Sequence, residues 1–192
     1  SAALMTRRGA AAASARPGIE VTFSDAELDR YARHLVLREV GGRGQALLHR
    51  ARVAVIGAGG LGSPCLLYLA AAGVGRITII DDDMVSLSNL QRQVLFASDE
   101  VGTPKAEAAA ARLKALNPHV EIMAAELRLD AGNADALLAG HDVIADGCDS
   151  FATRLVVADT ALGLRIPLVS GAVGPFDGQV ATFRGHEPDQ PC

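Results

Sequence analysis

From Phe23 onward, short apolar runs alternate along the chain with longer stretches whose apolar positions recur with the period of an α-helix. Short apolar runs bounded by turn-forming residues are typical of buried β-strands. We predict strands at residues 52–56, 76–80, 120–124, 142–146, 167–171 and 179–183. Because strands and helices alternate, the pattern predicts an α/β fold, a Rossmann-like doubly wound sheet that is mostly parallel and carries helices on both faces.

Two helices are marked by residues at their ends. Ser24-Asp-Ala-Glu27 is a capping box, which predicts an N-terminal helical extension that runs to about Val40 and ends at Gly41-Gly42. Thr103-Pro104 precedes an alanine-rich segment that stops at Asn117-Pro118. Proline suits the first turn of a helix and asparagine suits its end, so a helix is predicted between them.

A further helix is predicted late in the chain. Phe151, Leu155, Ala158 and Leu162 follow one another at helical spacing. An apolar stripe of this kind is typical of the buried side of a helix, so we expect these four side chains to face the sheet.

The chain length favours one domain. A chain of 192 residues is long enough for a substantial core, and 49% hydrophobic residues with a mean hydropathy of +0.23 fit a globular α/β protein. We expect this domain to span residues 23–192 and residues 1–22 to form a flexible leader. The leader is alanine-rich and carries Arg7, Arg8 and Arg16. Organelle-targeting peptides share that composition, but the amphipathic spacing is poor here.

Charge and cysteine content narrow the class of protein. The net charge is −4, which gives no overall reason to expect a nucleic-acid-binding protein. The apolar stretch 64–75 is too short to span a bilayer, so no membrane segment is expected. Cys65, Cys148 and Cys192 lie far apart, which makes a disulfide framework unexpected and favours the reducing cytoplasm.

A glycine-rich turn carries the strongest sign of ligand binding. Gly57, Gly59, Gly60 and Gly62 follow the first predicted strand and precede an apolar segment at 64–72 that we expect to be helical. Glycines allow a tight turn whose backbone N–H groups face a phosphate at the helix N-terminus. Asp81, at the end of the next strand, can accept hydrogen bonds from ribose hydroxyls. The turn predicts a nucleotide site, and an NAD-dependent oxidoreductase is one candidate.

Two segments beyond this turn offer positive charge. Residues 85–93 include Asn89 and Arg92, whose amide and guanidinium groups could donate to phosphates. The alternative is a helix start with a solvated arginine. Lys105 occupies the first turn of a predicted helix, where the helix dipole disfavours a cation. This placement favours an anionic ligand there, and the alternative is an ordinary surface lysine.

Two further positions have a functional and a structural interpretation. Asp149, in the motif Asp146-Gly-Cys-Asp-Ser150, follows a predicted strand at the sheet edge where ligands collect, and it could hold Mg²⁺. The alternative is that Asp149 or Ser150 caps the next helix. Arg33, on the first predicted helix, is either a solvated residue or a residue that meets a nucleotide site of its own or of a second subunit.

Together these residues resemble the ATP-dependent adenylyltransferases of the MoeB/ThiF/HesA family, its MoeB members above all, which activate ubiquitin-like proteins. The matching motifs, which run in order between Phe23 and Cys192, are Arg30-Tyr-x-Arg33-His, Gly57-x-Gly-Gly-x-Gly62, Asp81-x-Asp-x-Val-Ser-x-Ser-Asn-Leu-x-Arg92-Gln, Gly102-x-Pro-Lys105, Asn117-Pro118 and Asp146-x-x-Asp149 with Arg154.

The resemblance implies a role for each matched residue. The implied nucleotide-binding residues are Gly57, Gly59, Gly60, Gly62, Asp81, Ser88, Asn89, Arg92, Lys105, Asp149 and Ser150. Among them Asp81 is expected to bind the ribose, and Asn89, Arg92 and Lys105 the phosphates. Asp149 is expected to bind Mg²⁺. Arg33 resembles the arginine that reaches across a homodimer into the partner's ATP site. The implied catalytic residues are Arg33, Arg92, Lys105 and Asp149.

The implied reaction is adenylation of a ubiquitin-like sulfur carrier. The carboxylate of a C-terminal Gly-Gly attacks the α-phosphorus of ATP and expels pyrophosphate, ahead of sulfur transfer. Charge neutralisation and alignment carry such a reaction, so neither Cys65 nor Cys148 is expected to act as a nucleophile. The carrier could belong to molybdopterin, thiamine or thiolated-tRNA synthesis, or the core could serve a related tRNA-modifying dehydration.

This chain departs from the family pattern in two places. Cys148 and Ser150 stand where the family often has Thr and Asn around its carboxylate. Cys192 resembles the first cysteine of a C-x-x-C that, with a later pair, holds a structural Zn²⁺, and one cysteine cannot complete a four-ligand site. A second interpretation of the resemblance is a non-catalytic subunit of a heterodimeric activating enzyme. Such subunits tend to lose the phosphate-contacting residues that this chain retains.

Overall fold

The computed structural model describes residues 21–191 and contains one six-stranded sheet with the strand order β3-β2-β1-β4-β5-β6. The strands are β1 (Arg52–Ile56), β2 (Arg76–Ile80), β3 (Glu121–Ala125), β4 (Val143–Asp146), β5 (Leu168–Val173) and β6 (Gly178–Phe183). The first five are parallel, and β6 pairs antiparallel with β5. The predicted Rossmann-like fold is confirmed.

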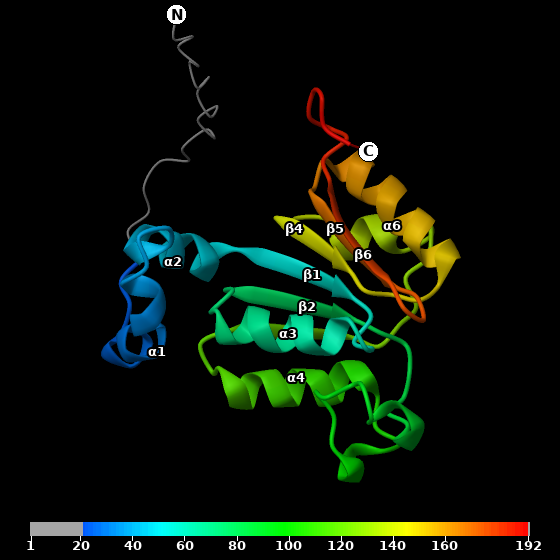
Figure 1. The fold of residues 1–192 in the computed structure, drawn as a ribbon, viewed down its shortest axis with the longest axis horizontal. Helices are drawn as coiled ribbons and strands as arrows, with labels where there is room; N and C mark the ends of the chain where they lie inside the picture. Colours follow the sequence, from blue (N-terminus) through cyan, green and yellow to red (C-terminus); the bar gives the residue numbers. More distant parts are fainter. Residues whose placement is uncertain (1–20, 192) are drawn as a thin grey trace, which may run out of the picture.

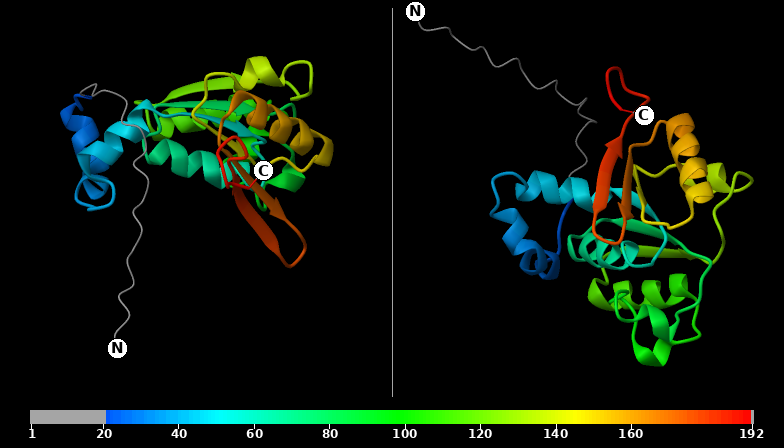
Figure 2. Two further views of the ribbon diagram at one scale, coloured as in Figure 1. Left: turned by 90° about the horizontal axis from the view of Figure 1, so that it is seen from above. Right: turned by 45° about the vertical axis from the view of Figure 1, so that its right-hand side comes forward.

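Helices cover both faces of this sheet, while α1 and α2 form a hairpin at the end where the strands begin (Figure 1). The helices are α1 (Asp25–Leu35), α2 (Gly41–Arg50), α3 (Gly62–Ala71), α4 (Lys105–Leu116), α5 (Ala134–Leu138) and α6 (Phe151–Leu164). Helices α3 and α4 pack on one face, and α6, with α5 against it, packs on the other. Strands β5 and β6 project from the body as an antiparallel ribbon (Figure 2).

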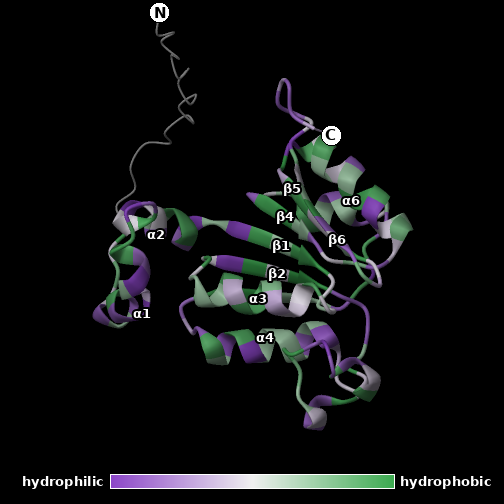
Figure 3. Cartoon of the chain, viewed as in Figure 1, coloured by the Kyte–Doolittle hydropathy of each residue, from purple (hydrophilic) through white to green (hydrophobic). Residues whose placement is uncertain are grey.

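Two apolar layers hold the helices onto the sheet. Ile77 and Ile79 of β2 are fully buried on the α3–α4 side, whereas Ile80 and Ile144 are buried on the α5–α6 side. The central strands are mostly hydrophobic along their length (Figure 3). Each such side chain contributes about 1.5–3 kcal/mol by leaving water, so the centre of the sheet is the rigid part of the fold.

Strand register brings the ends of three strands together. Ile56 of β1 lies opposite Ile80 of β2 on one side and Asp146 of β4 on the other. The loops that follow these strands therefore begin side by side. Strand order reverses between β1 and β4, and in open α/β sheets ligands bind at such a reversal, outside the carboxyl ends of the strands.

The predicted end of the first helix is wrong. Helix α1 ends at Leu35, and Gly41, with φ +55°, begins the separate helix α2 instead of ending α1. A buried polar contact explains the hairpin: Gln45 Oε1 lies 2.8 Å from His34 Nδ1, and Gln45 Nε2 donates to the Ala72 carbonyl at 2.9 Å. These hydrogen bonds form only if the chain folds back after α1.

The predicted buried stripe of α6 is also wrong. Phe151, Leu155 and Leu162 are 74%, 53% and 47% exposed, and Ala158 is exposed as well. The buried side of α6 is instead formed by Thr153, Val157 and Ala161. Both stripes have helical spacing. Spacing alone could not choose between them.

The remaining predicted strands and helices appear within two residues of their expected bounds, and α5 is additional. The predicted leader lies almost wholly outside the described residues, as does Cys192 with its predicted zinc. Among residues 21–191, no helix has both the length and the apolar character needed to cross a bilayer.

Candidate active site

A cleft of about 810 Å³ opens at the carboxyl ends of β1, β2, β4 and β5. Eight of the predicted site residues line it: Gly57, Gly59, Gly60, Asp81, Arg92, Lys105, Asp149 and Ser150. These residues come from three connections, after β1, β2 and β4, and from the start of α4. Only the fold brings them together, and their assembly in one cleft supports treating them as one site.

Four predicted residues that the structure describes lie outside the lining. Gly62 stands behind the turn, and Ser88 and Asn89 lie in the short 3-10 turn Leu87–Asn89. The Ser88 carbonyl accepts a hydrogen bond from Arg92 Nη1 at 3.3 Å. The turn therefore holds the arginine that does reach the cleft. Arg33 is far from this cleft, at the other end of the strands.

The glycine turn is shaped by close backbone contacts at Gly57 and Gly62. Gly57 has φ +84° and packs against the backbone of Gly147 and Cys148. A Cβ on Gly62 would overlap the carbonyl oxygen of Gly57. The buried Ser63 hydroxyl donates to the Ala58 carbonyl at 2.8 Å. The turn is thus held rigid at the N-terminus of α3, where backbone N–H groups favour an anion.

Asp81 is bound to the same turn. Its Oδ2 accepts a hydrogen bond from the Ala58 N–H at 2.7 Å, and its Oδ1 accepts one from the Asp83 N–H at 2.9 Å. Burial raises the pKa of this carboxyl above its usual value, and the two N–H donors and Lys105 oppose that rise. A fixed carboxylate at the end of β2 is suited to accepting hydrogen bonds from a diol.

Lys105 is not the ordinary surface lysine of the alternative interpretation. It is only 4% exposed, and its Nζ donates to Asp83 Oδ2 at 2.8 Å. It is the first residue of α4, where the positive end of the helix dipole is next to its ammonium group. The cleft therefore holds the Lys105 ammonium group at the start of α4, paired with Asp83.

The loop after β4 is held by a partly buried arginine. Arg154 Nη1 donates to Asp146 Oδ2 at 3.1 Å and to Ser170 Oγ at 2.9 Å. Arg154 Nη2 donates to the carbonyls of Cys148 and Gly171. These bonds tie the loop to β4 and β5, and they fix the backbone that carries Asp149.

Ser150, and not Asp149, caps α6. The Ser150 hydroxyl accepts a hydrogen bond from the Thr153 N–H at 3.3 Å. Asp149 is exposed and has no hydrogen bond or ion pair among residues 21–191. Its carboxylate is therefore free to bind a cation in the cleft. Of the two residues predicted as alternative helix caps, only Ser150 has that role.

The cysteine in the cleft is a neutral thiol at ordinary pH. Burial, with the nearby Asp146 carboxylate, raises the pKa of Cys148 to about 12. Burial also raises the pKa of Cys65. The thiolate is the nucleophilic form of cysteine, so both thiols lack the activation that a nucleophile needs.

Sequence reasoning assigned no role to two residues of the cleft. Asp83 pairs with Lys105. Gln93 is 4% exposed and lines the cleft, and its Oε1 is the one buried side-chain oxygen or nitrogen without a partner in residues 21–191. Both occur within the motif Asp81–Gln93, so their position in that motif was the available signal.

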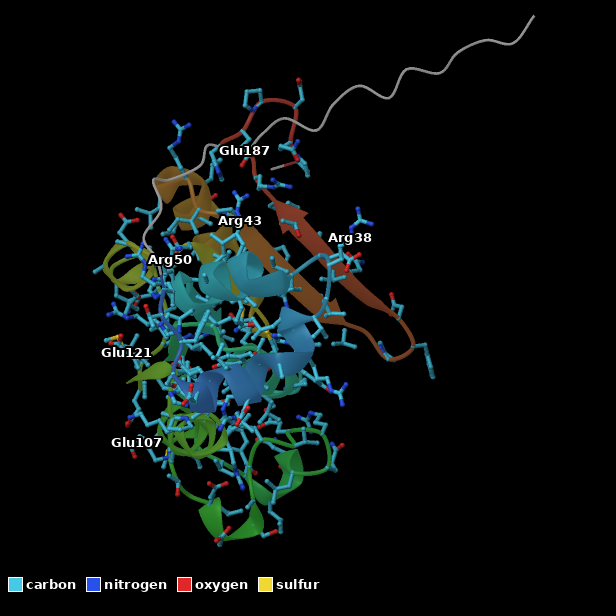
Figure 4. The ribbon with its side chains drawn as sticks, turned by 90° about the vertical axis from the view of Figure 1, so that its left-hand side faces the viewer. Arg38, Arg43, Arg50, Glu107, Glu121 and Glu187 are labelled. Atoms are coloured by element: carbon cyan, nitrogen blue, oxygen red, sulfur yellow. The ribbon has the colours of Figure 1, made fainter. Side chains whose placement is uncertain are left out.

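Arg33 projects from α1 at the opposite end of the sheet. It is exposed, and no partner within residues 21–191 contacts its guanidinium group. The hairpin that carries it is rich in arginine, and Arg38, between α1 and α2, also projects outward (Figure 4). The cleft of the same subunit lies at the other end of the strands from Arg33 (Figure 1).

Comparison with known proteins identifies a matching family and several similar proteins. The model of the ThiF family matches residues 31–192. The chain is 52% identical over 162 residues to a sulfur carrier protein adenylyltransferase of Thermus thermophilus, covering 84% of this chain and 59% of that protein. It is 50% identical over 166 residues to a SAMP-activating enzyme E1 of Haloferax volcanii, covering 86% and 60%.

A solved structure has the same fold. The E. coli tRNA N6-threonylcarbamoyladenosine dehydratase TcdA, in complex with AMP, superposes with a TM-score of 0.75 at 32% identity, over 81% of this chain and 63% of that one. The chain thus spans about three fifths of the length of the curated relatives that it matches.

Proposed function

The chain belongs to the ThiF family, and we propose that it uses ATP and Mg²⁺ to adenylate the C-terminal carboxylate of a ubiquitin-like sulfur carrier, ahead of sulfur transfer. One observation carries the proposal. The rigid glycine turn, the fixed carboxylate of Asp81, two cations and the free carboxylate of Asp149 share one cleft at the strand-order reversal.

Relatives support the choice of reaction and partner. One is named for adenylating a sulfur carrier and another for activating SAMP, and both align with most of this chain. A third, at 43% identity, is named for adenylating molybdopterin synthase. We propose a carrier of this class ending in Gly-Gly as the acceptor, from molybdopterin, thiamine or thiolated-tRNA synthesis.

ATP would lie along the carboxyl edge of the sheet. Asp81 would accept hydrogen bonds from the ribose, and the backbone N–H groups of the glycine turn, at the N-terminus of α3, would face the phosphates. Arg92, whose side chain lies against Gly60, and Lys105 would bind the phosphates. Ser88 and Asn89 would act by holding the backbone next to Arg92.

The residues present also fit a magnesium ion. Mg²⁺ is bound by oxygen ligands, usually one or two carboxylates together with substrate phosphates. Asp149 offers an exposed carboxylate in the cleft, without a competing partner among the described residues. A bound Mg²⁺ would neutralise phosphate charge. Ser150 would keep its capping role and fix the backbone beside this carboxylate.

The chemical step needs alignment more than proton transfer. A carboxylate oxygen of the carrier forms a bond to the α-phosphorus, the bond from that phosphorus to the bridging oxygen breaks, and pyrophosphate leaves with the electron pair. Arg92 and Lys105 would neutralise the charge that develops on the phosphate oxygens. The product is an acyl-adenylate, ready to receive sulfur.

Because of Arg33, the proposed function includes a homodimer. We place it as a phosphate-binding residue of a partner subunit's cleft in a homodimer, since its own cleft lies at the other end of the sheet. In such a dimer, each subunit would contribute its Arg33 to the cleft of the other subunit. A structural zinc that includes Cys192 stays a prediction, because that residue is outside the described part of the chain.

The two alternatives have less support. A nicotinamide-dependent oxidoreductase would explain the glycine turn but not Lys105, Arg92 and Asp149. A non-catalytic subunit of a heterodimer would not need those three residues either, and their retention favours a catalytic one.

Isotope exchange tests the proposal. The full-length protein, Mg²⁺ and candidate Gly-Gly carriers should exchange labelled pyrophosphate into ATP, and the carrier should gain the mass of one adenylyl group. Comparing carriers from the three pathways identifies the acceptor. Absence of exchange with every carrier, or tight binding of NADH without binding of ATP, would sink the proposal.

A further inference from the structure

Lys105 is held from two directions by one residue. Its Nζ donates to Asp83 Oδ2 at 2.8 Å, and its backbone N–H donates to the Asp83 carbonyl at 2.9 Å. The backbone bond belongs to a short antiparallel pairing in which Met84 bridges Pro104 and the Val85 N–H donates to the Thr103 carbonyl. The start of α4 is therefore attached to the loop after β2 at both the main chain and the side chain.

Burial makes the side-chain contact important. The Lys105 side chain is 5% exposed, and its neighbours on α4, including Ala106 and Ala109, are buried alanines. A buried ammonium without a partner is costly, so it adopts the position that its partner dictates. Asp83 Oδ2 is the hydrogen-bond acceptor of that ammonium within the described residues. Asp83 itself is 67% exposed at the side chain, so it loses little hydration.

Asp83 is in turn located by the residue proposed to bind the ribose. Its backbone N–H donates to Asp81 Oδ1, while Asp81 Oδ2 accepts from Ala58 in the glycine turn. A continuous series of hydrogen bonds thus runs from the turn through Asp81 and Asp83 to Lys105. Three side-chain oxygens of the acidic residues Asp81–Asp83 already accept hydrogen bonds.

We propose that Asp83 is a positioning residue that fixes the distance between the ribose-binding and phosphate-binding halves of the cleft by aiming Lys105 Nζ. It acts through Lys105 and not by touching the nucleotide. This inference rests on the proposed function, because it needs a nucleotide whose phosphates meet Lys105. It predicts, in addition, that removing the Asp83 charge weakens binding of the phosphates and leaves binding of the ribose unchanged.

Nucleotide binding without a carrier tests this directly. In the full chain, Asp83→Asn should weaken ATP binding about tenfold while adenosine, which has no phosphates, binds as before. Asp83→Glu keeps the charge and should restore most of the affinity for ATP. The matched control is Asp99→Asn, an exposed carboxylate in the same β2–α4 connection outside the cleft lining, which should leave ATP binding unchanged.

A double-mutant cycle separates positioning from direct contact. In a Lys105→Met background, Asp83→Asn should change ATP affinity by less than about twofold, because the group that it positions is gone. The inference is overturned if Asp83→Asn leaves ATP affinity unchanged, if the loss persists in the Lys105→Met background, or if adenosine affinity falls equally. Failure of the unmodified protein to bind ATP overturns the proposed function, and this inference with it.

Discussion

Asn117 Nδ2 donates a hydrogen bond to the hydroxyl of Tyr31 at 2.9 Å, which joins the end of α4 to α1. The same amide donates to the Ala70 carbonyl at 2.7 Å, so one side chain connects three helices. The Tyr31 ring also rests on Gly73, where a Cβ would overlap it. Helix α1 is therefore fixed on the body, and the direction in which Arg33 projects is fixed with it.

Subunit mixing tests the role of Arg33. Arg33→Ala and Asp149→Ala homodimers should each be nearly inactive in pyrophosphate exchange. A mixed dimer should regain part of the activity, because one of its two clefts then has both residues. Inactivity of the mixture, after native mass spectrometry has verified subunit exchange, would rule out action across the interface.

Asp149 and its neighbour should separate catalysis from stability. Asp149→Asn should lower adenylation about 100-fold or more while the melting temperature stays unchanged, since its carboxylate makes no contact within residues 21–191. Ser150→Ala should instead reduce the free energy of unfolding by about 1 kcal/mol, because it removes the helix cap. Urea unfolding and exchange assays on both variants provide the comparison. Destabilisation by Asp149→Asn would contradict this assignment.

Two glycine variants test the steric argument for the nucleotide turn. Gly62→Ala should abolish ATP binding and cost roughly 1–3 kcal/mol of stability, because the new methyl group would overlap the Gly57 carbonyl. Gly42→Ala is the matched control in α2, where no atom lies within 4 Å of the added Cβ. It should stabilise the protein by about 0.5–1 kcal/mol and leave ATP binding intact. Calorimetry and thermal unfolding report both effects.

The buried side chain of Gln93 lowers the stability of the fold. Its Oε1 is buried without a partner, so Gln93→Met should raise the free energy of unfolding by about 1 kcal/mol. Gln45→Met is the contrasting control, because both ends of that buried amide are hydrogen-bonded, and it should lower stability by about 1–3 kcal/mol. Equal effects of the two substitutions in urea unfolding would be the contrary result.

The pKa of Cys148 predicts slow alkylation. In a Cys65→Ser, Cys192→Ser variant, iodoacetamide at pH 8 should label the remaining thiol far more slowly than a free cysteine, because a pKa of about 12 leaves very little thiolate. The folded state holds this proton more tightly than the unfolded chain, whose ordinary value is 9.0. The resulting stabilisation is present below pH 9 and is lost as pH rises toward about 12. Rapid labelling of the native protein at pH 8 would refute the shift.

The local sequence pattern predicts much of the fold, and the two predictions that were wrong share one cause. The strands were predictable because a buried strand of a parallel sheet is apolar on both faces, as in β1 and β2. The end of α1 and the buried side of α6 depend on partners distant in sequence. Gln45 bonds to the Ala72 carbonyl, and Val157 requires the sheet beneath it. No local window contains those partners.

In the site, too, some features follow from the local sequence and others depend on partners distant in sequence. The loops that carry Gly57, Asp81 and Asp149 were predictable, because the carboxyl ends of parallel strands meet at one edge. The choice between Asp149 and Ser150 as helix cap needed the backbone geometry of that loop. The pairing of Lys105 with Asp83 joins segments that lie apart along the chain, and it depends on the bridge between Met84 and Pro104.

The parallel pairing of β1 has a consequence for how the chain folds during synthesis. One edge of β1 pairs with β2, which the ribosome delivers soon afterwards, but the other edge pairs with β4, which emerges much later. Until then Val53, Val55 and Ile56 belong to a strand with an open edge, a template for intermolecular association. Slow translation between α4 and β4, or chaperones that shield this edge, should therefore govern the yield of native protein.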